Sequence, residues 1–152
     1  LLLKLWRLLY ESIQITDCGP VSGHSAQTQA KLQIMMQYIH DNYSGQITLD
    51  DIAGTVLICK SSVLNIFRIY LHTSPINYVV EYRLKRASKL LVDTENSVCA
   101  IAHETGFENI GYFCRRFKKL YGVTPINYRK YYRSAERNSM RNIHSDTNVL
   151  SG

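Results

Sequence analysis

The sequence of 152 residues contains few turn-forming residues and no long apolar run. It has only three prolines and eight glycines, so helices are expected to make up most of the fold. Its longest apolar stretch is far shorter than the roughly 18 residues that span a bilayer, and we expect no membrane partner. Apolar residues account for 45% and charged residues for 20%, which is typical of a globular chain rather than a disordered one.

The four cysteines, Cys18, Cys59, Cys99 and Cys114, are widely scattered. They form no C-x-x-C pair and have no nearby His-x-x-x-His, which excludes a zinc finger or zinc ribbon. A chain of this length with so few cysteines is also not typical of a disulfide-stabilised fold. We therefore expect four reduced thiols in a cytoplasmic protein that binds no metal and no cofactor.

Known catalytic motifs are missing as well. His103-Glu104 begins like the zinc-binding H-E-x-x-H motif, but Phe107 stands where the second histidine is needed. Neither a phosphate-binding P-loop nor a G-x-S-x-G nucleophile motif is present. The sequence therefore predicts no catalytic residue and no enzyme.

Composition divides the chain into four zones. Leu1–Glu11 has the apolar stripe of a helix end, and residues 12–29 are polar and glycine-containing, as in a linker. Residues 30–133 are densely periodic and form the predicted globular domain. Residues 134–152 contain little apolar surface, which predicts a disordered tail.

The globular zone contains an internal repeat. Ser74–Tyr78 (SPINY) recurs 50 positions later as Thr124–Tyr128 (TPINY), and Ile52-Ala53 recurs 49 positions later as Ile101-Ala102. Two copies at this long period do not fit a solenoid. They predict two similar small helical units.

Each copy has the signals of two short helices around a turn. In the first, Thr48 followed by Asp51 predicts a capped helix start, and the chain must turn near Leu57. In the second, Ser97 is a helix cap and Gly106 can take a positive φ. This pattern is the helix-turn-helix signature.

A longer helix is predicted between the copies. Ser74 is a favourable N-cap with Pro75 at the first helical position. Val80, Leu84 and Leu91 then follow at helical spacing. We expect this helix to be a stiff connection that fixes the relative pose of the two units.

Positive charge is concentrated in the repeat. The whole chain has a net charge of +6, whereas residues 58–133 alone contain thirteen basic and five acidic residues. The second helix of the second copy carries four of them: Arg115, Arg116, Lys118 and Lys119. A solvated helix face could account for such a cluster, but its place on the outer helix of a helix-turn-helix favours nucleic-acid binding.

Several residues of the second copy form a distinctive set. They are Ile101-Ala102, Gly106-Phe107, Tyr112-Phe113, Arg116–Lys119, Gly122, Thr124-Pro125 and Tyr128-Arg129. The first copy adds Tyr38-Ile39, Leu49, Ile52-Ala53, Phe67, Ser74-Pro75 and Arg83-Leu84. Together they resemble the C-terminal DNA-binding domain of AraC/XylS-type bacterial transcription regulators. Leu57 and His72 depart from the resemblance, because small residues are usual at these two positions.

The resemblance implies an all-α fold of seven helices in two helix-turn-helix subdomains joined by a central helix. It further implies a bacterial, nucleoid-associated regulator that binds double-stranded promoter DNA and activates transcription with RNA polymerase. The residues expected to face bases are Ser61, Ser62, Leu64, Asn65, Ile110, Gly111, Cys114 and Arg115. The residues expected to contact phosphates are Lys60, Arg68, Asn109, Arg116, Lys118 and Lys119.

Alternatives to a regulator stay open. Cys114 lies on a positive helix, the setting of a reactive cysteine, so a DNA-repair protein that accepts methyl groups is one alternative. A helical protein–protein adaptor is another. DNA binding that weakens steeply with salt would favour the regulator. For Leu1–Glu11, two interpretations are equal: the end of an upstream sensing domain that forms a homodimer, or an apolar helix that self-associates.

Overall fold

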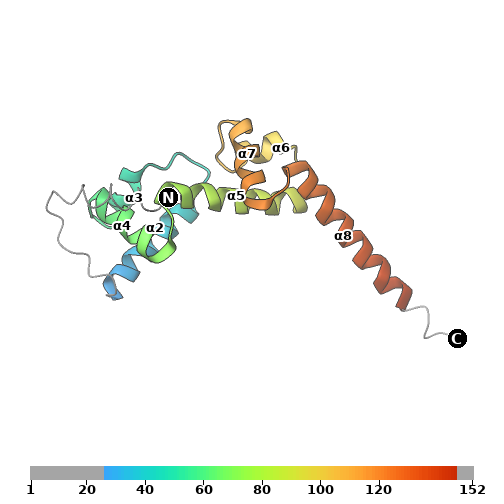
Figure 1. Ribbon diagram of the computed structural model, residues 1–152, viewed down its shortest axis with the longest axis horizontal. Helices are drawn as coiled ribbons and strands as arrows, with labels where there is room; N and C mark the ends of the chain where they lie inside the picture. The colour runs from blue at the N-terminus through green and yellow to red at the C-terminus, as the bar shows by residue number, and fades with distance from the viewer. Residues whose placement is uncertain (1–25, 147–152) are drawn as a thin grey trace, which may run out of the picture.

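The computed structural model describes the backbone of residues 26–146 and the side chains of residues 26–137. Within this part of the chain every regular element is a helix, which confirms the all-α class. The described helices are α2 (Ala26–Asn42), α3 (Leu49–Thr55), α4 (Lys60–Leu71), α5 (Pro75–Asp93), α6 (Val98–Glu104), α7 (Ile110–Tyr121) and α8 (Pro125–Asp146). Helix α5 lies in the middle, with α2–α4 around one end and α6–α7 around the other (Figure 1).

Two hydrophobic cores lie along α5. The first contains Leu32, Met35, Ile39, Ile52, Ala53, Val63, Ile66, Phe67 and Val79. The second contains Val80, Leu84, Ala87, Leu91, Ile101, Ala102, Phe107, Phe113 and Phe117. Adjacent residues of α5, Val79 and Val80, thus belong to different cores. Helix α5 is therefore the last helix of the first unit and the first helix of the second.

The expected helix starts are confirmed. At α3, Thr48 and Asp51 form a complete capping box, in which the Asp51 carboxylate accepts bonds from Thr48 N at 2.8 Å and Thr48 Oγ1 at 2.7 Å. These bonds lower the pKa of Asp51. Ser74 and Ser97 cap α5 and α6 by accepting backbone N–H groups at 3.2 Å and 3.1 Å. Each cap satisfies an N–H group that the helix itself leaves unpaired.

The turns of the two units take the same left-handed backbone conformation. Leu57 (φ 53°) and Gly106 (φ 87°) occupy equivalent positions in the turns within the two helix-turn-helix motifs. His72 (φ 53°) and Gly122 (φ 78°) are equivalent residues at the ends of α4 and α7. Glycine adopts this conformation without steric cost, whereas a residue with a side chain does not. The first unit therefore carries strain at both positions where the second has glycine.

Two zone boundaries differ from the sequence-based expectation. Helix α2 begins at Ala26, inside the predicted linker, and α8 continues to Asp146, where a disordered tail was expected from Ser134. A helix that is already nucleated at Pro125 extends at low cost through residues such as Ala135 and Glu136. The low apolar content of residues 134–146 leaves few apolar side chains to pack against the rest of the domain, but it does not prevent a helix from forming. The helix predicted at residues 1–11 lies outside the described residues.

The cysteines also differ from expectation. Cys99 and Cys114 are free thiols, but Cys59 is disulfide-bonded. Cys59 is an exposed residue at the N-cap of α4. The expectation of four reduced thiols is therefore wrong at this position.

In the described part of the chain, no single helix is both long and apolar enough to be a candidate membrane span. The α3–α4 pair passes that test only when taken together, and it is bent by 87°.

Strain at Leu57 gives a prediction for stability. The Leu57 side chain is 91% exposed, so Leu57→Gly removes almost no packing while relieving the left-handed backbone. We expect the free energy of unfolding to rise by about 1 kcal/mol, measured by urea denaturation. Gly122→Ala places a side chain at φ 78° with nothing within 4 Å, and should lower stability by a similar amount. A lower free energy of unfolding in Leu57→Gly would contradict the claim that the backbone at Leu57 is strained.

An aromatic cluster holds α2 on α5. The His40 ring stacks on Tyr82 with centroids 4.1 Å apart, and its Nε2 lies 2.9 Å from the Tyr78 hydroxyl. Burial lowers the pKa of His40, and Lys85 acts in the same direction, whereas Asp41 raises it. The unfolded chain therefore binds this proton more readily than the folded one.

The His40 environment predicts a pH dependence. The pKa of His40 is lower in the folded state than its ordinary value of 6.5. Its contribution to the free energy of unfolding is therefore complete above pH 6.5 and is lost as the pH falls below that value. The free energy of unfolding should thus decrease between neutral and mildly acidic pH. His40→Gln should flatten this slope, and His103→Gln on the exposed surface of α6 should retain it. An unchanged slope in His40→Gln would contradict the assignment.

Candidate nucleic-acid interface

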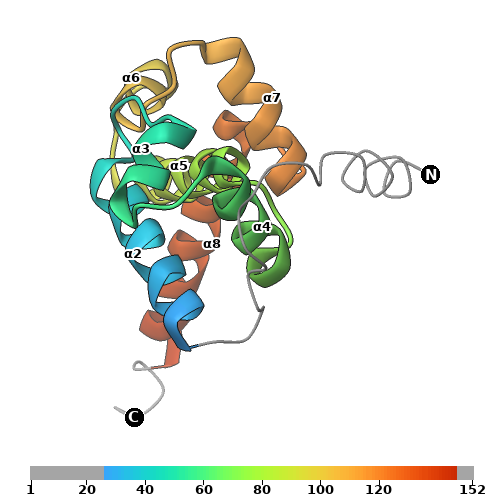
Figure 2. The same ribbon diagram turned by 90° about the vertical axis from the view of Figure 1, so that its left-hand side faces the viewer.

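The two helix-turn-helix motifs are α3–α4 and α6–α7. The axes of α3 and α4 differ by 87°, close to the right-angled crossing of this motif. We call the second helix of each motif, α4 in the first unit and α7 in the second, the outer helix. Viewed along the long axis of the molecule, α4 and α7 lie on the same side, and α2, α3 and α6 lie on the other (Figure 2).

The first turns of α4 present a weakly charged surface. Ser61 and Leu64 are exposed, while Ser62 and Asn65 are half-buried. Lys60, which was expected to contact a phosphate, forms an exposed ion pair with Asp50 at 2.7 Å. Such a pair contributes little stability and exchanges readily, so Lys60 stays available to an external anion.

Helix α7 presents Ile110, Gly111 and Arg115 to solvent. A Cβ at Gly111 would lie 3.5 Å from Arg115 Nη1 and 3.2 Å from Asn109 Oδ1. The guanidinium of Arg115 thus lies beside Gly111, near the helix N-terminus. Cys114, expected at the bases, is half-buried against the second core. Its contacts are those of a small apolar residue.

Asn109 has a structural role at the start of α7. Its Oδ1 accepts the backbone N–H of Tyr112 at 2.7 Å and so caps α7. This bond uses the side-chain oxygen, whereas the expected phosphate contact would use the Nδ2 amide as donor.

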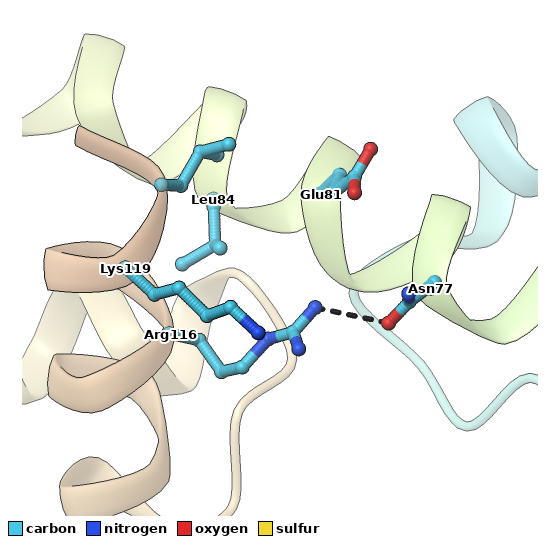
Figure 3. Close-up of a pocket in the computed structure, with 6 residues that line it drawn as sticks. Asn77, Glu81, Leu84, Arg116 and Lys119 are labelled. Atoms are coloured by element: carbon cyan, nitrogen blue, oxygen red, sulfur yellow. Dashed lines mark hydrogen bonds between the residues drawn. The ribbon is translucent and has the colours of Figure 1, made fainter. Parts of the chain in front are cut away.

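Arg116 is drawn toward α5 and away from the outer surface of α7. Its Nη2 donates to Asn77 Oδ1 at 3.0 Å. The two residues line a pocket of about 180 Å³ between α5 and α7, together with Glu81, Leu84, Lys119 and Leu120 (Figure 3). Arg116 thus joins the two units within the protein, although it was expected to meet a phosphate.

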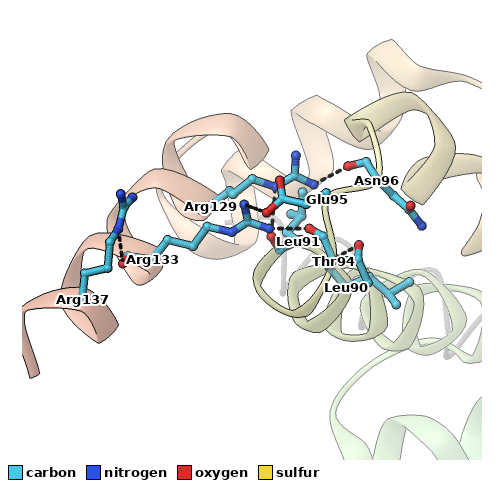
Figure 4. A network of polar contacts seen from close by, with 8 residues as sticks. All are labelled: Leu90, Leu91, Thr94, Glu95, Asn96, Arg129, Arg133 and Arg137. Carbon is cyan, nitrogen blue, oxygen red and sulfur yellow. Dashed lines mark hydrogen bonds and ion pairs between the residues drawn. The ribbon is translucent and has the colours of Figure 1, made fainter. Parts of the chain in front are cut away.

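Three further arginines hold the fold together. Arg83 on α5 donates from Nε to Tyr43 O at 2.7 Å, just beyond the end of α2. Arg133 on α8 donates to Thr94 O, just beyond the end of α5, and to Glu95 at 2.5 Å. Arg129 donates to Leu91 O and Asn96 O at 2.9 and 2.5 Å (Figure 4). Each stabilises carbonyl groups that a helix end or loop leaves unpaired.

These arginine clamps were not predicted from the sequence, because Arg83, Arg129 and Arg133 entered the charge count of the repeat and were assigned no contact within the protein. A signal was available, since Arg83 and Arg133 are 50 positions apart and so belong to the repeat. The basic side chains of α7 that stay exposed are Arg115, Lys118 and Lys119. Arg68 on α4 is half-buried. Positive surface therefore gathers on the second unit.

Within the residues that the structure describes, no group of three or more His, Cys, Asp or Glu side chains is arranged to hold a metal ion. The geometry here is that of a helical binding surface with exposed helix N-termini and cationic side chains. Such a surface is suited to phosphates and base edges.

The cap at Asn109 can be tested directly. Asn109→Ala leaves the Tyr112 N–H without its partner and should lower the free energy of unfolding by about 1 kcal/mol. Asn109→Ser keeps an oxygen in reach of that N–H and should retain most of the stability. Equal losses in the two variants, measured by urea denaturation, would show that the cap contributes nothing.

A model of a family described as "Helix-turn-helix domain" matches residues 52–131. The chain is 31% identical over 100 residues to an uncharacterised HTH-type transcriptional regulator, YdeC, of Bacillus subtilis, covering 66% of this chain and 34% of that protein. It is 27% identical over 127 residues to the Msm operon regulatory protein of Streptococcus mutans, covering 84% and 46%. The chain thus spans less than half the length of these relatives.

Among solved structures, it resembles a transcriptional regulator from Chromobacterium violaceum described by its AraC-type DNA-binding domain. The identity is 30%, the TM-score is 0.66, and 70% of this chain and 95% of that chain are covered. The family and these relatives are transcription regulators and not enzymes, so the methyl-acceptor alternative has no support. The chain belongs to the AraC-type helix-turn-helix family of DNA-binding transcription regulators.

Proposed function

We propose that this domain binds promoter DNA by inserting α4 and α7 into successive major grooves on one face of the duplex. The observation that carries the proposal is that both outer helices lie on the same side of the molecule (Figure 2). A major groove admits an α-helix, and its N-terminal residues then reach the base edges. Two helices fixed on one face match two grooves about one helical turn apart.

The proposed base contacts are divided unequally between the units. In the second unit, Arg115 is exposed beside Gly111 and can take guanine O6 and N7 in a bidentate contact. Ile110 and Gly111 offer apolar surface and close approach. In the first unit, Ser61 and Leu64 are the exposed candidates, and Ser62 and Asn65 are less accessible. In the second unit, the half-buried Cys114 is less accessible than Arg115. The second unit should therefore dominate discrimination between sequences.

Phosphate contacts are proposed mainly for the exposed cations of the two outer helices. Lys118 and Lys119 fit this role best, because both are exposed on α7. Lys60 would exchange its ion pair with Asp50 for a phosphate. The half-buried Arg68 would reach the backbone beside α4. Arg116 is already engaged with Asn77, so it is the weaker candidate. Asn109 uses only its Oδ1 to cap α7, and its Nδ2 amide would donate to a phosphate.

Regulation of transcription is the activity we propose for the whole protein. A bound regulator that activates must contact RNA polymerase, and the operon-regulator name of one relative supports control of a neighbouring operon. Dimerisation is assigned to a segment outside the described residues. The proposed place of action is the bacterial cytoplasm, at the nucleoid, where promoters lie.

Replacement of Arg115 tests the proposed base contact. A site is first obtained by selection of bound sequences from a random DNA pool with the unmodified protein. Arg115→Ala should weaken specific binding by about 1–3 kcal/mol and relax the choice of base at one position, with little change in non-specific binding. Lys89→Ala, an exposed residue on α5, is the matched control and should bind normally.

Binding is measured by fluorescence anisotropy at fixed salt, because affinity for DNA depends steeply on ionic strength. Retention of full specific affinity by Arg115→Ala would contradict the contact. Failure of the pool to yield any specific site would contradict the proposed function as a whole.

A further inference from the structure

The two units touch each other directly, beside their connection through α5. We call this contact the seam and define it as the loop Tyr43–Gln46 of the first unit, the turn Gly106–Glu108 of the second, and Arg83 between them. A Cβ at Gly106 would lie 2.8 Å from Tyr43 O and 2.9 Å from Ser44 O. Backbone therefore meets backbone at a distance that admits only glycine.

Arg83 connects both sides of the seam. It donates from Nε to Tyr43 O at 2.7 Å and from Nη2 to Gly45 O at 2.6 Å, which fixes the loop of the first unit. Its guanidinium carbon lies 5.9 Å from the centre of the Phe107 ring in the second unit. Burial lowers the pKa of Arg83, and the nearby Glu108 acts against this. A guanidinium stays charged in proteins, so these bonds are charge-assisted.

Two polar contacts add to the connection between the units. Gln46 Nε2 in the first unit donates to Glu108 Oε1 in the second at 3.1 Å. Arg116 on α7 donates to Asn77, at the start of α5 and within the first unit, at 3.0 Å. Both pairs are exposed, so their removal should not endanger folding.

We propose that the seam is a positioning element that sets the spacing and rotation of α7 relative to α4, so that the domain discriminates between DNA sites by the distance between their two halves. This inference rests on the proposed insertion of both helices into one duplex. Long helices bend gently along their length. If α5 were the sole connection, its bending would allow the two units to shift relative to each other. The seam adds a second connection and makes the pair rigid.

Rigidity has a consequence for DNA recognition. One inserted base pair moves the second half-site by about 3.4 Å and rotates it by about 34°. A rigid pair of helices cannot follow both changes, so one helix loses its base contacts. A domain with a weakened seam can follow in part and should tolerate the insertion.

The chain offers a matched control for Arg83. Arg133 is its equivalent in the repeat and binds the carbonyl of Thr94 beyond the end of α5. It lies wholly within the second unit and does not contact the seam. Arg133→Met and Arg83→Met therefore remove clamps of the same kind. Only the Arg83 clamp joins the two units.

The experiment uses the full chain and the DNA site selected above, together with versions carrying one inserted or one deleted base pair between the half-sites. The unmodified protein should lose about tenfold or more in affinity on either change, because base contacts of one unit are lost. Arg83→Met should reduce this penalty to about threefold or less. Its affinity for an isolated half-site should stay unchanged. Arg133→Met should retain the full spacing penalty.

Gln46→Ala keeps the proposal testable if Arg83→Met does not fold. It is exposed and should reduce the spacing penalty in the same direction by a smaller factor. A spacing penalty that is identical in the unmodified protein, Arg83→Met and Gln46→Ala would overturn the positioning role. Absence of specific binding by the unmodified protein would instead overturn the proposed function, so the two failures are distinguishable.

Discussion

Burial of the two faces of α5 in two different cores is the constraint on which the rest of the structure depends. Val79 belongs to the first core and its neighbour Val80 to the second. Burial of a large apolar side chain contributes about 1.5–3 kcal/mol, so neither unit can separate from α5 without a large loss. Both helix-turn-helix motifs are thereby anchored on one helix, and α4 and α7 share one side of the molecule.

Basic residues have two roles in this domain: some stabilise the fold and others stay exposed on its surface. Arg83, Arg129 and Arg133 hold helix ends and loops through bonds to carbonyl groups. Lys118 and Lys119 stay exposed on α7. Arginine suits the first task because its planar fork reaches two acceptors at once, whereas lysine acts as a point charge. Net charge alone therefore overstates the surface that is free to attract DNA.

Much of the fold could be predicted from the sequence because its signals are local. The caps at Thr48, Ser74 and Ser97 each depend on residues within three positions, and the repeat revealed two similar units. The seam could not be predicted, since Arg83 meets Tyr43 across 40 positions of chain. Among the site residues, exposure of Arg115 agrees with its expected role, but no pattern in the sequence reveals that Arg116 turns toward Asn77.

The insertion of α4 and α7 into successive major grooves is tested most directly by a hydroxyl-radical footprint of the unmodified protein on its selected DNA site. Two helices fixed on one side of the molecule should protect two blocks of backbone about 10 base pairs apart, centre to centre, on the same face of the duplex. A single protected block, or two blocks on opposite faces, would contradict the account.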